Sequence, residues 1–375
     1  MAGGILARAS GHARARPSGV PEGDQPPGAW REEHRVATQW VAMGGLGRLG
    51  AVALATAGVL VVTALPAGAL STTPAYAGDF PDPFVLPVGG TYWAYSTGSA
   101  GRNLQVMSST DLQTWTAPAD PLPALPSWAS AGSTWAPGVV QLAGQYLIYY
   151  TVHDPALARQ CIGVAISSTP GGPFVDHSTR PLVCQANGSI DPNPFTDPRT
   201  GRTYLLWKSD DNSVGLPTRL WASRLSPDGL SLTGGTALLL TETPSSWQAP
   251  AIEGPTVMVA SGTSSYYLFY GAGAWDTAQA GIGYAACQPP STGLRGLRWT
   301  CQDRSVPAPW LATRVVSGTT VFSGPSGPTV FTDTAGNVHL GYHAWTGTTV
   351  GYGSGGVRSL WIDSLTFVGG IPVLS

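Results

Sequence analysis

The tetrapeptide Gly-Pro-Thr-Val occurs twice in this chain, within Glu253-Gly-Pro-Thr-Val257 and within Ser326-Gly-Pro-Thr-Val330. A segment rich in aromatic residues follows each copy after a short gap, at residues 266–271 and at residues 338–343. Short segments of this kind, with alternating side chains, are typical of β-strands. The recurring pair of a proline motif and an aromatic strand therefore indicates two copies of one structural unit.

Three further copies of this unit lie upstream in the same order. Their proline motifs are Asp82-Pro-Phe-Val85, Trp135-Ala-Pro-Gly-Val139 and Asp191-Pro-Asn-Pro-Phe195, and their aromatic strands are residues 91–96, 145–150 and 203–208. A second strand-like segment follows each aromatic strand, at residues 103–107, 161–165, 219–223, 281–285 and 357–361. The starts of successive aromatic strands are about 54, 58, 63 and 72 residues apart.

Self-similarity in a fixed order is the signature of a repeat architecture. Each unit has the strand content of one four-stranded propeller blade. The sequence therefore predicts an all-β fold, a five-bladed β-propeller over residues 78–375. A two-sheet sandwich is the alternative, but its turns recur about every 8–12 residues without this longer period.

Composition narrows the class of protein further. The chain has 375 residues, with 49 Gly and 33 Pro, and 43% of its residues are hydrophobic, which excludes a disordered chain. Lys208 is the only lysine, so a long-helix or coiled-coil protein is also excluded. Residues 78–375 carry 13 Lys and Arg against 17 Asp and Glu, which suits a neutral, sugar-like partner and not a nucleic acid.

The N-terminal region has the pattern of an export signal. Residues 1–42 are polar and predicted to be unstructured, and Met43 is the expected start of translation. An apolar run at residues 49–65 precedes two small-residue cleavage sites, Ala67-Gly-Ala69 and Ala75-Tyr-Ala77. The run is short for a membrane span. We therefore predict a signal peptide and linker at residues 43–77 and a secreted chain with no membrane segment after signal removal; a signal anchor is the alternative.

All four cysteines follow this region. An even number in an exported chain favours two disulfides, and no C-x-x-C pair indicates a zinc site. Pairing of nearest neighbours, Cys161 with Cys184 and Cys287 with Cys301, is the prediction among three possible connectivities.

Three of the five proline motifs begin with a carboxylate: Asp82, Asp191 and Glu253. We expect the aromatic strand to be the first of each blade and to line the central channel, so that the first residue of each motif faces the axis. Carboxylates that converge raise one another's proton affinity. A protonated and an ionised carboxylate across a sugar ring are what glycoside hydrolysis requires. The sequence contains no G-x-S-x-G motif of serine hydrolases, no P-loop and no H-E-x-x-H motif of zinc proteases.

The ordered set of motifs resembles glycoside hydrolase family 43, whose members are five-bladed propellers that act on arabinan and xylan. The matching pieces are Phe80-Pro-Asp-Pro-Phe84, Trp135-Ala-Pro137, Gly188-Ser-Ile-Asp-Pro-Asn-Pro-Phe195, Ile252-Glu-Gly-Pro255, Tyr342-His-Ala-Trp345 and Arg358-Ser-Leu-Trp-Ile-Asp363. The resemblance implies that Asp82 is the general base, Glu253 the general acid, and Asp191 the residue that tunes and orients the acid. The family inverts at the anomeric carbon, so Asp82 and Glu253 are expected about 6.5–9.5 Å apart.

The resemblance also implies roles for other channel residues. His343 matches an axial histidine that in arabinan-degrading members helps to hold a calcium ion or water; a hydrogen-bonded histidine without metal is the alternative. No cofactor is expected for the chemistry itself. Arg358 resembles an arginine that reaches the bound sugar in xylosidase members, although a surface position is the alternative. Aromatic faces stack on sugar rings, so four tryptophans near the channel are candidate binding residues: Trp135, Trp207, Trp275 and Trp345.

The expected function is therefore that of a secreted, monomeric, inverting hydrolase of α-L-arabinofuranosyl linkages in arabinan or arabinoxylan of plant cell walls. The segments Gln160-Cys-Ile-Gly-Val-Ala165 and Gly188-Ser-Ile-Asp-Pro192 look most like arabinan-active members. Three alternatives stay open at this stage: a β-xylosidase of the same fold, a catalytically silent glycan-binding propeller, and a retaining fructan-active propeller with Asp82 as the nucleophile.

Overall fold

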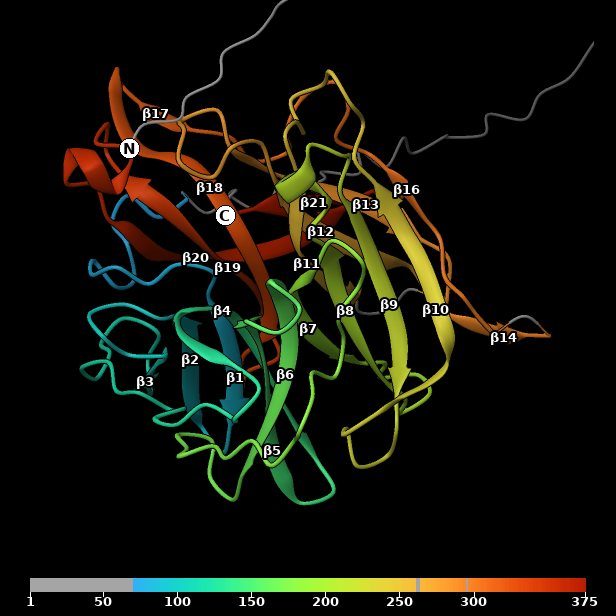
Figure 1. Cartoon of the computed structure of the whole chain (residues 1–375). Helices are drawn as coiled ribbons and strands as arrows, with labels where there is room; N and C mark the ends of the chain where they lie inside the picture. The colour runs from blue at the N-terminus through green and yellow to red at the C-terminus, as the bar shows by residue number, and fades with distance from the viewer. Residues whose placement is uncertain (1–69, 261–263, 295) are drawn as a thin grey trace, which may run out of the picture. The chain divides into compact units, whose positions relative to one another are not determined.

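Five antiparallel sheets surround one axis in the computed structural model, which describes residues 70–260, 264–294 and 296–375 (Figure 1). The prediction of an all-β, five-bladed propeller is confirmed. The predicted N-terminal extension at 1–42 and most of the predicted signal peptide, up to residue 69, lie outside the described residues. The helices of the described ranges are single 3-10 turns, η1 (Asp211–Val214) and η2 (Tyr352–Ser354), so none of them can cross a membrane.

The blades follow one another along the chain. The first has strands β1 (Phe84–Val88), β2 (Thr91–Thr97) and β3 (Leu104–Ser109). The second has β4 (Ser130–Leu142), β5 (Gln145–Asp154) and β6 (Arg159–Ser167), and the third has β7 (Ser189–Thr196), β8 (Thr203–Ser209), β9 (Arg219–Leu225) and β10 (Leu232–Thr241). The fourth has β11 (Ile252–Val259), β12 (Tyr266–Ala272), β13 (Gly281–Cys287) and β16 (Cys301–Asp303), with a separate hairpin of β14 (Ser291–Gly293) and β15 (Gly296–Arg298). The fifth has β17 (Arg314–Val316), β18 (Thr319–Thr332), β19 (Val338–Thr346), β20 (Arg358–Val368) and β21 (Ile371–Leu374).

The proline motifs, and not the aromatic strands, belong to the innermost part of each blade. The motifs lie on or directly before β1, β4, β7, β11 and β18, and these strands contact one another in a closed ring. The predicted aromatic strands are β2, β5, β8, β12 and β19, the next strand out in each sheet. The expectation that the aromatic strands line the channel is therefore wrong, because each motif belongs to a separate inner strand that pairs with the aromatic strand.

Apolar side chains on both faces of the sheets build one core cluster at each of the five blade interfaces. Tyr204 of β8 and Tyr270 of β12, for example, pack between the third and fourth blades. Phe80 and Leu360 pack between the first and fifth blades, where the circle closes. When both faces of a sheet are buried, apolar and polar side chains need not alternate along its strands. The blade arrangement thus explains why the aromatic strands contain so many consecutive apolar residues.

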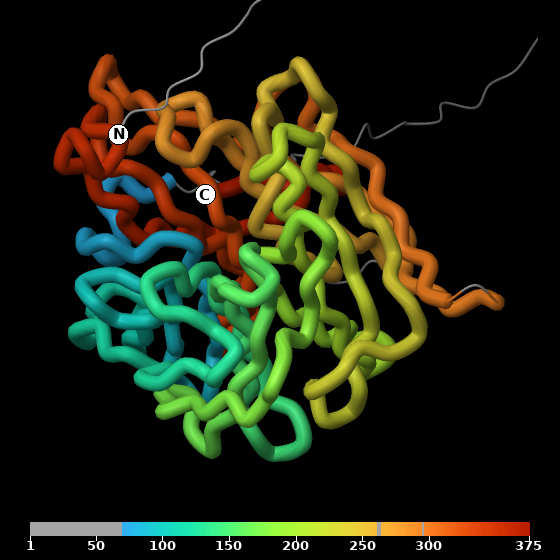
Figure 2. Tube along the Cα trace, in the orientation of Figure 1, coloured from blue at the N-terminus to red at the C-terminus, as the bar shows by residue number. Residues whose placement is uncertain are grey.

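The N-terminal end of the described chain completes the last blade. Tyr76 and Leu360 of β20 exchange backbone hydrogen bonds of 3.2 and 3.0 Å. The backbone N–H of Ser71 donates to Asp363 Oδ1 over 2.7 Å. Figure 2 shows this blue segment beside the red C-terminal strands. Residues 71–77, predicted as part of a linker, therefore contact the closing blade.

Both predicted disulfides are present. Cys161–Cys184 joins β6 to the segment that follows it, whose Val183 also bridges Ile162. Cys287–Cys301 joins β13 to β16, where the two cysteines are direct cross-strand neighbours. Each crosslink holds the outer edge of a blade, so neither lies on the inner strands that carry the motifs.

Candidate active site

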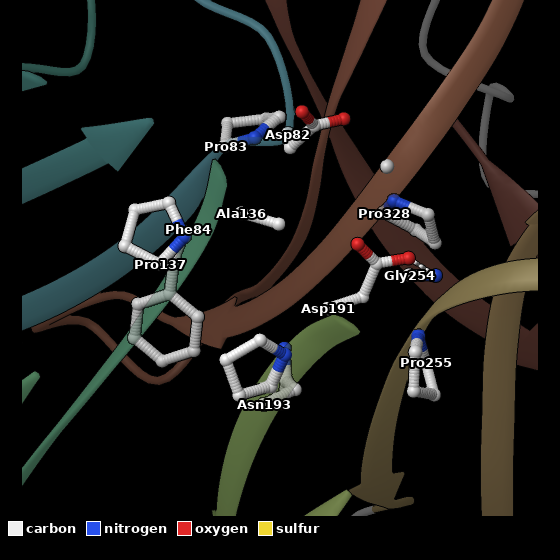
Figure 3. Close-up of a pocket in the computed structure, with 12 residues that line it drawn as sticks. Asp82, Pro83, Phe84, Ala136, Pro137, Asp191, Asn193, Gly254, Pro255 and Pro328 are labelled. Atoms are coloured by element: carbon white, nitrogen blue, oxygen red, sulfur yellow. Dashed lines mark hydrogen bonds between the residues drawn. The ribbon is translucent and has the colours of Figure 1, made fainter. Parts of the chain in front are cut away.

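Each inner strand repeats one backbone feature, a residue with positive φ followed directly by proline. The five positive-φ residues are Asp82 (51°), Ala136 (44°), Asp191 (56°), Gly254 (56°) and Gly327 (58°). With their prolines they line a narrow axial channel of about 30 Å³ (Figure 3). Glycine adopts this conformation without cost and aspartate tolerates it. At Gly327 a side chain is also excluded by space, since a Cβ would lie 2.7 Å from His343 Nδ1.

This repeat corrects the register of the three carboxylates. Asp82 and Asp191 precede their prolines directly and are equivalent, but Gly254 holds that position in the fourth blade. Glu253 is one residue earlier, at the position that Ile190 occupies in the third blade. The motifs differ in the number of residues before the proline, so their first residues are not all equivalent. Both positions nevertheless face the same cavity.

That cavity, of about 870 Å³, opens beside the channel and receives side chains from all five blades. Of the predicted site residues, six line it: Asp82, Asp191, Glu253, Trp135, Trp275 and Arg358. Others lining it were not singled out from the sequence, among them Asp79, Thr97, Lys208, Asp210 and Tyr352. The convergence of the three carboxylates expected from the motifs is thus what the fold produces.

Asp82 is held in its ionised form. Thr97 Oγ1 donates to Asp82 Oδ2 over 2.5 Å, and Arg358 Nη1 lies 3.7 Å from Asp82 Oδ1. Burial alone would raise the pKa of this carboxyl, but the positive charge of Arg358 and the hydrogen bond from Thr97 lower it below its usual value. Thr97 is itself fixed, because its Oγ1 accepts the backbone N–H of Ala136 over 2.9 Å.

Asp191 has the opposite environment. Its backbone N–H donates to Thr151 Oγ1 over 3.0 Å, and its Oδ2 accepts the backbone N–H of Gly254 over 3.0 Å (Figure 3). This bond fixes the Asp191 carboxyl beside the residue that follows Glu253. Burial, and then the neighbouring Glu253 carboxylate, raise the pKa of Asp191 to about 7. The two aspartates at equivalent places therefore differ in protonation near neutral pH.

Lys208 is a site residue that the motif reading missed. Its side chain on β8 is only 1% exposed, and its Nζ lies 3.3 Å from Glu253 Oε2 and 3.9 Å from Asp210 Oδ1. Burial would lower the pKa of this amine, but Glu253, Asp191 and Asp210 raise it, so the ammonium form persists. A buried ammonium needs such partners. The signal in the sequence was a single lysine at the end of an aromatic strand.

The predicted metal residue His343 lies in the channel wall but does not fit a calcium ligand. Its Nδ1 accepts the backbone N–H of Asp82 over 3.0 Å, and burial lowers the pKa of the ring to about 3. The neutral ring must then carry its proton on Nε2, which leaves no lone pair there for a cation. Because the ring is neutral, the 3.4 Å contact between its Nδ1 and Asp82 Oδ1 is not an ion pair.

Two further observations describe the surroundings of His343. Its Nε2 is buried without a hydrogen-bond partner among the described residues, so a water molecule that accepts its proton fits this position. In the described part of the chain, His, Cys, Asp and Glu side chains form no cluster of three suited to a metal ion.

Two of the four predicted tryptophans do not reach the cavity. Trp207 is 2% exposed and belongs to the core between the second and third blades, where its Nε1 donates to Gln185. Trp345 is fully buried and supports Trp275, because the two rings stack and Trp345 Nε1 donates to the Trp275 carbonyl over 3.1 Å. Their prediction as sugar-binding residues is wrong. Trp135 is half-buried and Trp275 is 41% exposed, and both line the cavity.

Arg358 faces the cavity, as the resemblance implied, and its guanidinium packs against a cluster of aromatic rings. Its Cζ lies 4.7 Å from the ring centre of Trp275 and 5.4 Å from that of Tyr352. Its Nε donates to Tyr352 Oη over 3.0 Å. Stacked and hydrogen-bonded in this way, the guanidinium has a fixed position next to Asp82.

A cavity that combines an ionised carboxylate, a proton-carrying carboxyl and exposed aromatic rings is suited to acid–base cleavage of a glycosidic bond. Comparison with protein families supports this chemistry, since the model of glycosyl hydrolases family 43 matches residues 71–372. The chain belongs to this family. It is therefore a glycoside hydrolase, and the match includes the segment that completes the fifth blade.

Two curated relatives and one solved structure share less than a third of their residues with this family 43 enzyme. It is 28% identical to an extracellular endo-α-(1→5)-L-arabinanase of Thermotoga petrophila over 52% of this chain and 46% of that protein, so it spans about half of the relative's length. It is 29% identical to a probable arabinan endo-1,5-α-L-arabinosidase A of Neosartorya fischeri, over 76% of this chain and 87% of the relative. Among solved structures, a thermostable family-43 glycoside hydrolase shares 25% identity with a TM-score of 0.65, covering 79% of this chain and 93% of the other.

Proposed function

We propose that this family 43 enzyme is an inverting hydrolase of α-L-arabinofuranosyl linkages in arabinan or arabinoxylan. The observation that carries the proposal is the contrast between Asp82 and Asp191, which face one cavity together with Glu253. Inversion needs an ionised base and a protonated acid at the same pH. Near neutral pH Asp82 is ionised and Asp191, next to the proposed acid Glu253, can hold a proton, so one cavity presents both states.

In the proposed reaction, Asp82 accepts a proton from water as the water oxygen attacks the anomeric carbon. Glu253 gives its proton to the glycosidic oxygen as the bond between that oxygen and the anomeric carbon breaks. Asp191, fixed by the N–H of Gly254, orients Glu253 and supplies it with a proton. Arg358 and Thr97 keep Asp82 ionised before the attack. No step requires a cofactor.

The names of the relatives support arabinan as the substrate class, since both sequence relatives described above are named for arabinan hydrolysis. Exposed aromatic rings at Trp135 and Trp275 suit stacking on pentose rings. The two disulfides and the extracellular Thermotoga relative are consistent with export, and we propose that the enzyme is secreted and works as a monomer on plant cell-wall polysaccharide.

Hydrolysis of three substrates side by side tests the substrate class: an aryl α-L-arabinofuranoside, an aryl β-D-xyloside and linear arabinan. We expect turnover of the first and third. Turnover of the xyloside alone would establish the xylosidase alternative, and sugar binding without product at any pH would establish a silent propeller. Proton NMR of the first-formed anomer tests the mechanism, and net retention would contradict it.

Replacement of the proposed acid gives a second test. Glu253→Gln is close in size and should leave the fold and its melting temperature nearly unchanged. Because the variant cannot protonate a leaving group, we expect kcat for arabinan to fall by about 10²–10⁴-fold. An aryl arabinofuranoside with an acidic phenol should lose much less. Undiminished hydrolysis of arabinan by this variant would rule out Glu253 as the acid.

A further inference from the structure

The wall of the cavity next to Asp82 is built across the seam where the propeller closes. Tyr352 lies in the loop between β19 and β20, within η2, whereas Asp79 lies just before the first blade. Tyr352 Oη donates to Asp79 Oδ1 over 3.0 Å. The backbone N–H of Arg358 donates to the same oxygen over 3.3 Å. The fifth blade is thus joined to the segment that leads into the first blade, in the cavity that the proposed base also lines.

The same wall continues into the fourth blade. The ring of Tyr352 lies 6.0 Å from that of Trp275 and 5.2 Å from that of the buried Trp345. Tyr352 is 45% exposed and Trp275 is 41% exposed, so both rings present a face to the cavity. Arg358 lies beneath them and holds Tyr352 through Nε. Asp79, Tyr352 and Trp275, which we call the seam wall, therefore form one connected and supported surface.

The position of the seam wall matters for how a polysaccharide can lie in the cavity. In an inverting reaction the base and the leaving group are on opposite faces of the sugar that is attacked. Arg358 contacts the Trp275 and Tyr352 rings of the seam wall, and its Nη1 is only 3.7 Å from Asp82 Oδ1, so the wall adjoins the base. Lys208 and Asp210 adjoin Glu253 on the other side. A chain that continued past the attacked sugar on the side of the base would meet the wall.

We propose that the seam wall closes the cavity on the side of Asp82 and makes this enzyme act from the non-reducing ends of arabinan chains. It releases a product of one fixed length and does not cut internal linkages. This inference rests on the proposed function, because it concerns the same site. It differs from the endo-acting arabinanases named among its relatives.

The test uses linear 1,5-α-arabinan and arabino-oligosaccharides carrying a fluorescent tag at the reducing end. We expect a single untagged product from the earliest time points, tagged chains that shorten by one constant step, and little loss of arabinan viscosity for each new reducing end. A ladder of tagged products with rapid loss of viscosity would overturn the inference while leaving the proposed function intact. Failure to hydrolyse arabinan and the aryl arabinofuranoside would overturn the proposed function itself.

Variants of the wall identify its role. Tyr352→Ala removes the ring and should convert part of the cleavage to internal linkages, seen as a larger viscosity loss per reducing end. Tyr352→Phe keeps the ring and should keep the single product. Val368→Ala, on the exposed end of β20 and outside the cavity, is the matched control. An unchanged single product from Tyr352→Ala would show that the seam wall does not set product length and would overturn the assignment.

Discussion

Two aspartates with the same backbone conformation carry different charges because of their neighbours. Asp82 and Asp191 share a positive φ and a following proline. Arg358 stands beside the first, and Glu253 beside the second. Such separation of pKa values among grouped carboxyls is what assigns acid and base roles in glycosidases. The repeat therefore supplies the scaffold, while single neighbours decide the chemistry at each copy.

The raised pKa of Asp191 predicts a linked change in stability and activity for Asp191→Asn. Between pH 3.8, its ordinary pKa, and about 7, the folded wild type binds more protons than the unfolded chain, so rising pH destabilises it. The asparagine variant lacks this effect and can still accept the Gly254 N–H. We expect its melting temperature to exceed that of the wild type by an amount that grows up to about pH 7 and then stays constant. Its kcat should fall by about 100-fold.

Calorimetry at several pH values measures this difference, and steady-state assays measure the loss of activity. A melting-temperature difference independent of pH would show that Asp191 titrates normally in the folded protein. Asp176→Asn, at a carboxylate that bonds Tyr150 away from the cavity, serves as the control for loss of one acidic side chain.

Lys208 is expected to govern the alkaline limit of activity. Burial and the Glu253 carboxylate raise the pKa of Asp191, whereas the positive charge of Lys208 lowers it. In Lys208→Met the pKa of Asp191 should rise further, so the alkaline limb of kcat/KM should move to higher pH while its maximum falls. The melting temperature should drop as well, because Glu253 and Asp210 lose their counter-charge. A reduced but unshifted pH profile would assign Lys208 a purely structural role.

The orientation of His343 predicts that the enzyme does not depend on calcium through this residue. Because Nδ1 accepts the Asp82 N–H, Nε2 offers a proton to the channel and not a lone pair. Treatment with EDTA, followed by titration with calcium, should leave both kcat/KM and the melting temperature unchanged. Loss of either on chelation, with recovery on adding calcium, would show that the ring binds in the opposite orientation.

At the scale of elements, the N-terminal segment acts as part of the last blade. Ser71 and Tyr76 bond β20 through Asp363 and Leu360. Cleavage after Ala77 would remove these contacts, whereas cleavage after Ala69 would keep them. We predict that mass spectrometry of the exported protein finds residues 71–77 retained.

A chain that starts at Gly78 tests the contribution of this segment. It loses the hydrogen bonds to β20 and the packing of the Tyr76 ring on Phe80. Its melting temperature should be lower by several degrees, because net hydrogen bonds contribute about 1 kcal/mol each. An equal melting temperature would mean that the fifth blade is complete without the segment.

At the scale of the whole molecule, much of the fold could be predicted because its information is local and repeated. Alternation and aromatic content located β2, β5, β8, β12 and β19, and neighbouring cysteines indicated both disulfides. Asp82 and Asp191 were found because a proline marks their place. Order among the strands within a blade was predicted less well, since the inner strands that carry the proline motifs have little pattern of their own.

The sequence by itself determined the five repeats, the strand-forming segments and two of the carboxylates, because each depends on residues within a few positions of one another. Only the tertiary structure decided the register of Glu253, the burial of Trp207 and Trp345, the tautomer of His343, and the contacts of Lys208. It also decided that Tyr352 meets Asp79. These features arise when a closed ring of blades brings distant segments together, and pairing over such separations leaves no periodic trace in the chain.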